Sequence, residues 1–439
     1  MSRIALTAAA FLVACGAAMA VDSNSVLIQN VTVHPVTAPD ISNASVLVID
    51  GKIAEVGSKA PAPAGVTVVD GQGLHLYPGL MNAATNVGLS EISAIRDSVD
   101  LDEIGLFNPE LRAEIAFNPS SEHIAVTRAS GITSVISLPG SGGNFAGLAG
   151  GEGTVISGQG ALMHMEGWTW EDMAIKPSAV MDVDFPQIQM VPHQFVVLLG
   201  LPQRTFADVE REYKERLDRF SDFIERARRY KQAKAAAAPD FKSDIKLEAM
   251  IPVIDGKIPL FVRASRERAI KDAVAFADKT KVKIIIADPL ELGSAGPLLK
   301  SHNIPVVLGK TFELPLRDDD PYDTPYTLPS QFYKAGVKIC FGTFDTEFAR
   351  NVPFEAAQAA AFGLPHDEAL KGLTINTAEI LGVGDQFGSI EKGKVADLIL
   401  TDGDPMEART NIKRMFIAGR EVSLESRHTR EYEKWSKRP

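Results

Sequence analysis

The histidines are the residues whose type and spacing bear most directly on chemistry. A metal-dependent hydrolase needs several neutral or anionic ligands that converge on one ion and leave a position for an activated water. The chain has no His-x-His and no His-x-x-x-His spacing, and so shows no local metal-ligand motif. Its eight histidines are widely spaced, at His34, His75, His123, His164, His193, His302, His366 and His428.

Two further segments carry residues that could bind a ligand. RDDDPYD, from Arg317 to Asp323, places four carboxylates close together, and a hard cation such as Ca²⁺ binds through oxygens. We favour a solvated turn there, because Asp and Pro are typical turn residues. GWTWEDM puts Trp168 and Trp170 near His164, and we expect these aromatic rings to pack rather than to line a pocket.

Length and charge exclude several classes of protein. The 439 residues are enough for a barrel of ~250 residues and a smaller domain. With 45% hydrophobic and 23% charged residues the chain has an ordinary globular composition. The net charge of -11 argues against nucleic-acid or acidic-membrane partners, because such partners are bound mainly through Lys and Arg.

The N-terminus predicts export. One basic residue, an apolar run and Ala18-Met19-Ala20 indicate a signal peptide over residues 1–20. Leu12-Val13-Ala14-Cys15 also fits a lipoprotein signal, in which Cys15 would be lipidated; either signal leads to a periplasmic or secreted protein. The other cysteine, Cys340, lies in an apolar run and is expected to be a buried small hydrophobe.

Both ends of the chain have a residue pattern that is typical of short β-strands. Residues 26–76 alternate β-branched runs with turns, and Asp50-Gly51 is a good hairpin turn because both residues tolerate positive φ. Residues 388–422 repeat this texture, with a turn at Ala418-Gly419-Arg420. We therefore expect a small β-sheet region at each end.

Between these ends, apolar runs alternate with helical segments, as in parallel βα units. A helix is predicted after Thr205, where apolar residues recur every three or four positions and Asp208 completes a capping box. The candidate strands are Leu80 to Ala83, Ile132 to Leu138, Gln194 to Leu199, Leu260 to Arg263, Lys283 to Ala287, Val306 to Leu308 and Val337 to Phe341.

The glycine-rich segment from Gly140 to Gly160 does not match a phosphate-binding loop. Its Walker-like spacing from Gly142 to Gly147 is followed by Leu148-Ala149, without the required Lys and Ser or Thr. We expect tight turns over the barrel mouth instead.

Two motifs resemble the amidohydrolase superfamily. LYPGLMNAATNVGLSEI is similar to its first barrel strand, where Pro-Gly-Leu-Ile/Met-Asp-Ala-His-x-His delivers two metal-binding histidines; here Asn82, Ala84 and Asn86 take the Asp and His positions. GSIEKGKVADLILTDGDP resembles the signature Gly-x-Ile/Leu-x-x-Gly-Lys-x-Ala-Asp-Leu, through Gly388, Gly393, Lys394, Ala396, Asp397 and Leu398. The chain is most similar to an imidazolonepropionase-related, secreted branch that lacks the His-x-His motif.

The resemblance implies an α/β fold, a (β/α)8 TIM-like barrel with a small composite β-sandwich formed from both termini. It divides the chain into a signal peptide (1–20), an N-terminal sandwich segment (21–76), the barrel (77–382), a C-terminal sandwich segment (383–425) and a tail (426–439). Barrels of this family often pair, so a homodimer is expected.

Carried over residue by residue, the resemblance leaves no histidine ligand. Arg263 stands where the fifth-strand histidine is expected, and Ala287 or Asp288 stands at the sixth-strand position. The eighth-strand Asp is displaced by one residue to Asp345, and the fourth-strand ligand could correspond only to Lys246 or Glu248. Because arginine cannot bind a metal, we expect no metal cofactor, although the family implies one.

The candidate site residues follow from these positions. Arg263, Asp345 and Glu248 are the predicted catalytic residues, and Asn86, Asp288 and Arg317 are the predicted substrate-binding residues. The Arg263 guanidinium could form an internal salt bridge with Glu248, Asp288 or Asp345, or bind a substrate carboxylate through two hydrogen bonds.

Two functions from different classes follow. The first is an exported hydrolase of non-peptide C–N bonds, in amides or cyclic amides, that has lost the usual ligands. The second is a non-catalytic protein on the same barrel that binds a small molecule through Arg263. In either case the partner is a small-molecule substrate or ligand.

Overall fold

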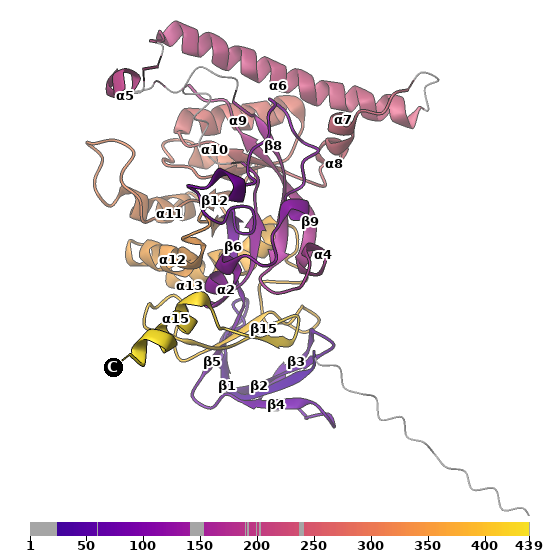
Figure 1. Cartoon of the computed structure of the whole chain (residues 1–439), viewed down its shortest axis with the longest axis vertical. Coiled ribbons are helices and arrows are strands. Elements are labelled where there is room, and N and C mark those ends of the chain that lie inside the picture. The colour runs from indigo at the N-terminus through magenta and orange to yellow at the C-terminus, as the bar shows by residue number, and fades with distance from the viewer. Residues whose placement is uncertain are drawn as a thin grey trace, which may run out of the picture.

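A barrel and a separate β-sheet body make up the chain. The computed structural model describes residues 24–58, 60–140, 153–188, 190, 193–198, 200–201, 203–236 and 241–438. Figure 1 shows the sheet body at one end, the barrel strands with their helices in the middle, and the long helix α6 (Phe206–Ala235) across the opposite end. The predicted signal peptide, residues 1–20, and Cys15 lie outside the described residues.

The barrel is an eight-stranded sheet in the order β13-β12-β11-β10-β9-β8-β7-β6. Seven strands run the same way, whereas β8 pairs antiparallel with both of its neighbours. Backbone amides of Thr343 and Phe344 donate to the Ala84 carbonyl at 2.9 and 2.8 Å and draw the last strand to the first. The barrel strands are β6 (Leu80–Thr85), β7 (Ile132–Ser137), β8 (Ile156–His164), β9 (Ala174–Asp184), β10 (Leu260–Arg263), β11 (Ile284–Ala287), β12 (Val306–Leu308) and β13 (Ile339–Phe341).

Alternation along each strand separates two cores. On β10, Leu260 and Val262 join the core between barrel and helices, whereas Phe261 joins the core inside the barrel. Cys340 also faces the inside and is fully buried, and burial raises the pKa of its thiol to about 12. The prediction that Cys340 is a buried small hydrophobe is confirmed.

Six of the seven predicted strands are present, and one is wrong. The run from Gln194 to Leu199 falls on the helix α5 (His193–Leu198), since a short apolar run fits helix and strand equally well. The strands β8 and β9 were not predicted, because β8 contains Gly158 and Gly160 and β9 contains Pro177, residues that usually mark loops. The predicted loop of residues 140–160 is therefore wrong from Ile156 onward, and residues 141–152 lie outside the described chain.

The second sheet combines both ends of the chain, as the resemblance implied. Its order is β16-β15-β14-β5-β1-β2-β3, with β4 also paired to β1. Asp50 and Gly51 have φ of 49° and 77°, and Ala418 and Gly419 have φ of 47° and 76°, so both predicted turns are confirmed. The strands are β1 (Val26–Val33), β2 (Ile41–Ile49), β3 (Lys52–Gly57), β4 (Thr67–Asp70), β5 (His75–Pro78), β14 (Leu398–Thr401), β15 (Ile412–Ile417) and β16 (Arg420–Val422).

The signature residue Asp397 links the two bodies, whereas Lys394 is held by residues of its own segment. The Asp397 side chain pairs with His164 of β8 at 3.0 Å and accepts the Ala418 amide at 2.8 Å. Its carbonyl accepts the amide of Gly79, just before β6. The Lys394 ammonium is nearly buried and donates to Ser389 Oγ and the Gly384 carbonyl. These two residues are structural, since burying charged groups requires such partners.

The helix α6 starts as predicted, with a capping box between Thr205 and Asp208. None of the helices in the described ranges is both long and apolar enough to cross a membrane. The other described helices are α1 (Ala113–Ala116), α2 (Glu122–Arg128), α4 (Trp170–Met173), α7 (Ile245–Ala249), α8 (Ile251–Ile254), α9 (Glu267–Thr280), α10 (Gly296–Ser301), α11 (Thr324–Lys334), α12 (Val352–Ala361), α13 (His366–Gly372), α14 (Ile375–Ile380) and α15 (Arg427–Ser436), with 3-10 turns at Arg96–Ser98 and Ala349–Asn351.

Closure of the barrel requires glycine at position 342. A Cβ on Gly342 would lie 2.6 Å from the Ala84 Cβ and 2.9 Å from the Ala84 nitrogen. We expect Gly342→Ala to lower the free energy of unfolding by about 1–3 kcal/mol, as overpacking does, measured by denaturant titration. Gly57→Ala is the control, because nothing lies within 4 Å of a Cβ there, and its change should stay within about 0.5 kcal/mol. Equal stability of the two variants would contradict this account of closure.

Candidate active site at the barrel mouth

The carboxyl ends of β9 and β10 supply a layer of charged side chains at the mouth. Arg263 follows Phe261 on the inward face of β10, and its register partner on β9 is Asp184. Asp182 lies two residues earlier on β9, beside Phe261. Because side chains alternate across a strand, the three charged residues point to the same side, above the apolar interior.

Arg263 and Asp182 form a buried ion pair. Arg263 Nη2 lies 3.1 Å from Asp182 Oδ2, and the side chains are only 10% and 2% exposed. The pair is incompletely satisfied, because the buried atoms Arg263 Nε and Asp182 Oδ1 have no hydrogen-bond partner among the residues that the structure describes. The Phe344 ring centroid lies 5.7 Å from the guanidinium carbon. Two buried polar atoms without partners lower the stability of the fold. Such atoms are common at sites that bind a ligand or a water molecule.

The predicted salt bridge of Arg263 is therefore present, but its partner is Asp182. Burial disfavours the ionised carboxyl more than Arg263 favours it, and raises the pKa of Asp182 from 3.8 to about 7. Burial also acts against the charged guanidinium, but Asp182, Asp184 and Asp288 outweigh it and raise the pKa of Arg263. We conclude that Arg263 stays protonated whereas Asp182 changes charge near neutral pH.

Asp288 stands at the end of β11 in an unusual backbone conformation. Its φ is +50°, which a residue with a side chain rarely adopts. Gly309 makes room for its carboxylate, since a Cβ there would lie 1.9 Å from Asp288 Oδ1. Within the described ranges the carboxylate makes no hydrogen bond, and burial raises its pKa despite Arg263 and Lys310. Such strain at a strand end is typical of functional sites.

Lys310 and Asp345 form a second ion pair on the same face. Lys310 Nζ lies 2.8 Å from Asp345 Oδ2, and Asp345 Oδ1 accepts the Phe348 amide at 2.8 Å. Burial acts to lower the pKa of Lys310, but the contact with Asp345 outweighs it and raises that pKa. The ammonium is thus a fixed positive charge close to Asp288.

A small cleft opens beside Asp288, between the ends of β11 and β12 and the start of α11. It encloses about 30 Å³. Asp288, Lys310 and Thr311 supply its polar wall, and Leu290, Leu308 and Leu314 are among its apolar lining residues. A volume of this size admits a group of only a few non-hydrogen atoms.

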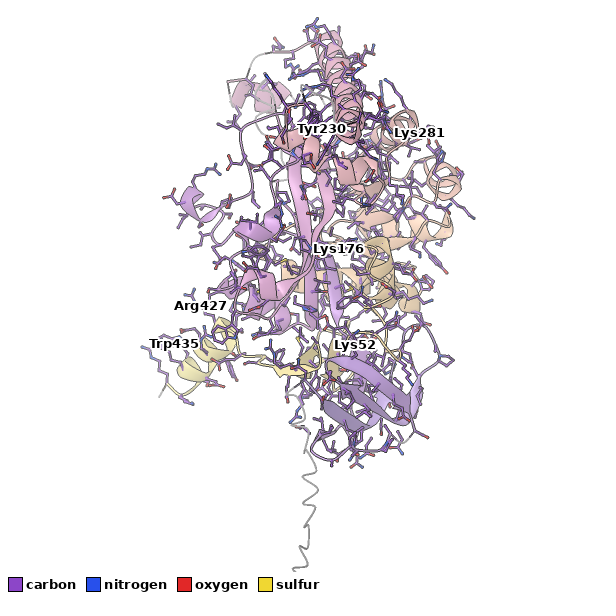
Figure 2. The ribbon with its side chains drawn as sticks, turned by 90° about the vertical axis from the view of Figure 1, so that its right-hand side faces the viewer. Lys52, Lys176, Tyr230, Lys281, Arg427 and Trp435 are labelled. Carbon is purple, nitrogen blue, oxygen red and sulfur yellow. The ribbon has the colours of Figure 1, made fainter. Side chains whose placement is uncertain are left out.

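Of the other predicted site residues, Glu248 lies apart from this cluster, whereas the backbone amide of Asn86 donates to the Asp345 carbonyl at 3.4 Å. Glu248 is on α7 and contacts Lys234 and Tyr230 of α6; Figure 2 labels Tyr230 near the end of the molecule away from the sandwich. Its assignment as an Arg263 partner was wrong, because the segment taken for a fourth strand is a helix. Asn86 donates to the Leu138 carbonyl at 2.9 Å and so has a structural contact. Arg317 is half-exposed and pairs with Glu291 at 2.9 Å.

The other candidate ligand segments have ordinary roles. In RDDDPYD, Asp320 accepts the Arg317 amide, which is the solvated turn that we favoured. Trp168 is 88% exposed, whereas Trp170 packs against the core, so the packing prediction holds for Trp170 only. Three histidines do gather, but outside the barrel, at a cleft between the sandwich and α13. His34 and His366 line this cleft, and His34 Nε2 lies 2.9 Å from His75 Nδ1.

Sequence reasoning missed Asp182, Asp184 and Lys310. Asp182 and Asp184 end the unpredicted strand β9, where the pattern VMDVD would have shown them alternating with apolar residues. Lys310 follows a strand that was predicted, and its place after VVLG, parallel to Asp288 after IIIA, was a usable signal.

Comparison with known proteins agrees with this architecture. The model of the Amidohydrolase family matches residues 331–422. The curated amidohydrolase tasK of Hapsidospora irregularis is 23% identical over 388 residues, which is 82% of this chain and 38% of that protein. An imidazolonepropionase of Sphingopyxis alaskensis is 50% identical over 50 residues, 11% of this chain and 12% of the relative. The chain thus spans less than half the length of the curated relatives it matches.

A solved structure covers far more of the fold. The crystal structure of an amidohydrolase from Thermotoga maritima is 26% identical and has a TM-score of 0.76, over 91% of this chain and 99% of that one. This likeness supports the predicted TIM-like barrel with an additional sheet body.

The residues at the mouth do not fit the divalent metal that such a resemblance implies. Ala84 has no donor atom, the Asn86 amide contacts backbone carbonyls, and Arg263 places a cation at the fifth-strand position. Among the side chains that the structure describes, no three His, Cys, Asp or Glu are arranged to hold a metal ion. We therefore derive no chemical step through a metal.

The buried carboxyl of Asp182 predicts a particular dependence on pH. Its pKa is raised in the folded protein, so its contribution to stability is complete below about pH 4 and is lost as the pH rises to about 7. Asp182→Asn cannot ionise. We expect its free energy of unfolding to improve relative to wild type between pH 4 and 7, by at most about 1.4 kcal/mol per pH unit.

Denaturant titrations at several pH values test this expectation. Asp218→Asn is the control, because Asp218 is an exposed residue of α6. A difference between wild type and Asp182→Asn that stays constant from pH 4 to 7 would show that the buried carboxyl is already ionised.

Proposed function

The chain belongs to the amidohydrolase superfamily, and from this premise we propose that it hydrolyses non-peptide C–N bonds of small amides or cyclic amides at the barrel mouth. The observation that carries the proposal is the placement of Asp288. Its carboxylate has no hydrogen-bond partner within the described ranges, has a raised pKa, interacts with the cations Arg263 and Lys310, and lies on the wall of a cleft. A base that is free beside two fixed positive charges is suited to amide hydrolysis.

In the proposed reaction, Asp288 acts as the general base. It accepts a proton from a water molecule, whose oxygen attacks the amide carbon. Negative charge then develops on the carbonyl oxygen, and donors of Lys310 or Arg263 stabilise it. Protonated Asp288 returns the proton to the leaving nitrogen as the C–N bond breaks, so amide and water become a carboxylic acid and an amine.

Two other residues position these groups. Asp345 holds Lys310 Nζ at 2.8 Å, and it is fixed in turn by the Phe348 amide. Asp182 holds Arg263 through its contact with Nη2 at 3.1 Å. Asp345 is thus a positioning residue in this proposal, whereas Arg263 keeps the catalytic role that the sequence predicted.

We also propose that the protein is exported and forms a homodimer. The N-terminal pattern of residues 1–20 supports an exported protein, with Cys15 as an alternative lipid anchor. An exported enzyme with a small-molecule substrate and a homodimeric assembly is the form that we propose.

A non-catalytic binding protein is the second candidate. It is favoured by the Arg263–Asp182 pair, which occupies the fifth-strand ligand position with a buried internal salt bridge. In this case the mouth would bind a small molecule and turn nothing over.

Asp288→Asn separates the two candidates. We expect this variant to lower kcat/KM for amide and cyclic amide substrates by about 10²–10⁴, the usual contribution of a general base, with an unchanged thermal unfolding profile. Asp278→Asn, an equal charge change on the outer surface, should keep wild-type activity. Full activity in Asp288→Asn would remove Asp288 as the base, and ligand binding without turnover by wild type would favour the binding protein.

Metal analysis of protein purified without chelators tests the protein-only mechanism. We expect substoichiometric zinc, manganese and iron, and turnover that a chelator does not change. Stoichiometric metal, lost together with activity on chelation, would overturn the mechanism.

A further inference from the structure

Charge at the barrel mouth is strongly unbalanced. Two cations, Arg263 and Lys310, lie among carboxylates that interact with them or with one another. These carboxylates are Asp102, Asp182, Asp184, Asp288, Glu313, Asp345 and Glu355. Even with Asp182 protonated, the negative charges outnumber the positive ones among these described residues, so this part of the mouth attracts cations and repels anions.

Arg263 and Lys310, the two cations named above, already form ion pairs with carboxylates. Arg263 contacts Asp182 and interacts with Asp184 and Asp288, and Lys310 contacts Asp345. A substrate carboxylate at Arg263 would enter a region where several carboxylates already surround one guanidinium. The electrostatic cost makes the carboxylate ligand expected from the sequence an unfavourable one.

Exposed apolar side chains lie along one side of the mouth. They lie on loops that follow the carboxyl ends of four parallel strands, and each is more than one third exposed: Ile92, Ile95 and Ile104 after β6, Leu290 after β11, Phe312 and Leu314 after β12, and Phe348 after β13. Ile104 is fully exposed and Leu314 is 87% exposed. Single exposed apolar residues are common, but several on one rim indicate a contact surface.

The loops that carry this rim are fastened to one another. Ser93 donates to Glu347 at 3.0 Å, which links the loops after β6 and β13. Arg317 donates to Glu291 at 2.9 Å, which links the loops after β11 and β12. The rim is therefore a defined border rather than a set of independent loops.

We propose that the site accepts an amphipathic cation, with a protonated amine beside Glu313 at the edge of the cleft, the reacting amide next to Asp288 and an apolar body against the rim. The cleft volume of about 30 Å³ admits a group of only a few non-hydrogen atoms, so the amine must lie at its edge and the body of the molecule over the rim. This inference rests on the proposed function: the substrate is an amide or cyclic amide that also carries a protonated amine.

Binding of simple probes tests the inference without hydrolysis. Octylammonium, octanoate and octanol, titrated calorimetrically below their aggregation concentrations, differ only in the head group. We expect octylammonium to bind at least tenfold more tightly than octanoate, and the preference to shrink as salt rises from about 0.05 to 0.5 M because the Debye length falls. Ethylammonium should bind more weakly than octylammonium, because it cannot reach the rim.

Two variants test the charge and the rim separately. Glu313 lines the cleft and interacts with Asp288 and Lys310 without a catalytic role, so Glu313→Gln should weaken octylammonium binding about threefold and leave octanol unchanged. Glu225→Gln, on the exposed side of α6, is the matched control and should change neither. Leu314→Ser should weaken octylammonium but not ethylammonium.

Equal or tighter binding of octanoate would overturn the inference, as would loss of octylammonium affinity in Glu225→Gln to the same extent as in Glu313→Gln. These readouts do not depend on turnover. A protein that binds octylammonium at the mouth but hydrolyses no amide would refute the proposed function and leave the cation preference standing.

Discussion

A guanidinium and a carboxylate are buried together at the mouth of the barrel, and the surrounding residues are arranged to accommodate them. The pair Arg263–Asp182 lies directly above the apolar interior. A single buried charge there, without a partner, would strongly destabilise the fold. Its partners must come from neighbouring strands, which explains why Asp184 and Asp288 lie at the ends of the strands on either side of β10. Removing Arg263 would leave the Asp182 carboxyl buried without the cation that contacts it.

This constraint depends on a barrel whose strands are closed and correctly staggered. The last strand reaches the first through amides that donate to the Ala84 carbonyl, and this approach leaves no room for a side chain at position 342. Asn82 reinforces the contact, since its amide donates to Thr343 Oγ1 at 3.0 Å and its oxygen accepts the Thr343 amide at 3.2 Å. Asp397 and His164 then fix the barrel to the sandwich. Asn82 and Ala84, which the resemblance aligns with metal-site positions, thus serve packing and closure in this chain.

The electrostatics of the mouth follow from the same arrangement. A buried arginine needs carboxylates, and the carboxylates that surround it exceed its charge. The excess makes the site selective for positive groups, while the exposed apolar rim offers contact area to the remainder of a ligand. The cleft itself is small, and so the chemistry at Asp288 and the recognition of the ligand body take place at different depths.

The sequence by itself determined the elements whose pattern is local. Asp50-Gly51 and Ala418-Gly419 specify their hairpins through residues that tolerate positive φ, and the strand Leu260–Arg263 is marked by its β-branched and apolar residues. Arg263 and Asp288 could be placed at strand ends for the same reason. Only the tertiary structure decided which charges meet. The partner of Arg263 lies on β9, a strand that the sequence did not predict because it contains Pro177. The pairing joins residues 81 positions apart and depends on the register of β9 against β10. Glu248 failed as a partner because a short apolar run does not distinguish helix from strand until packing chooses between them.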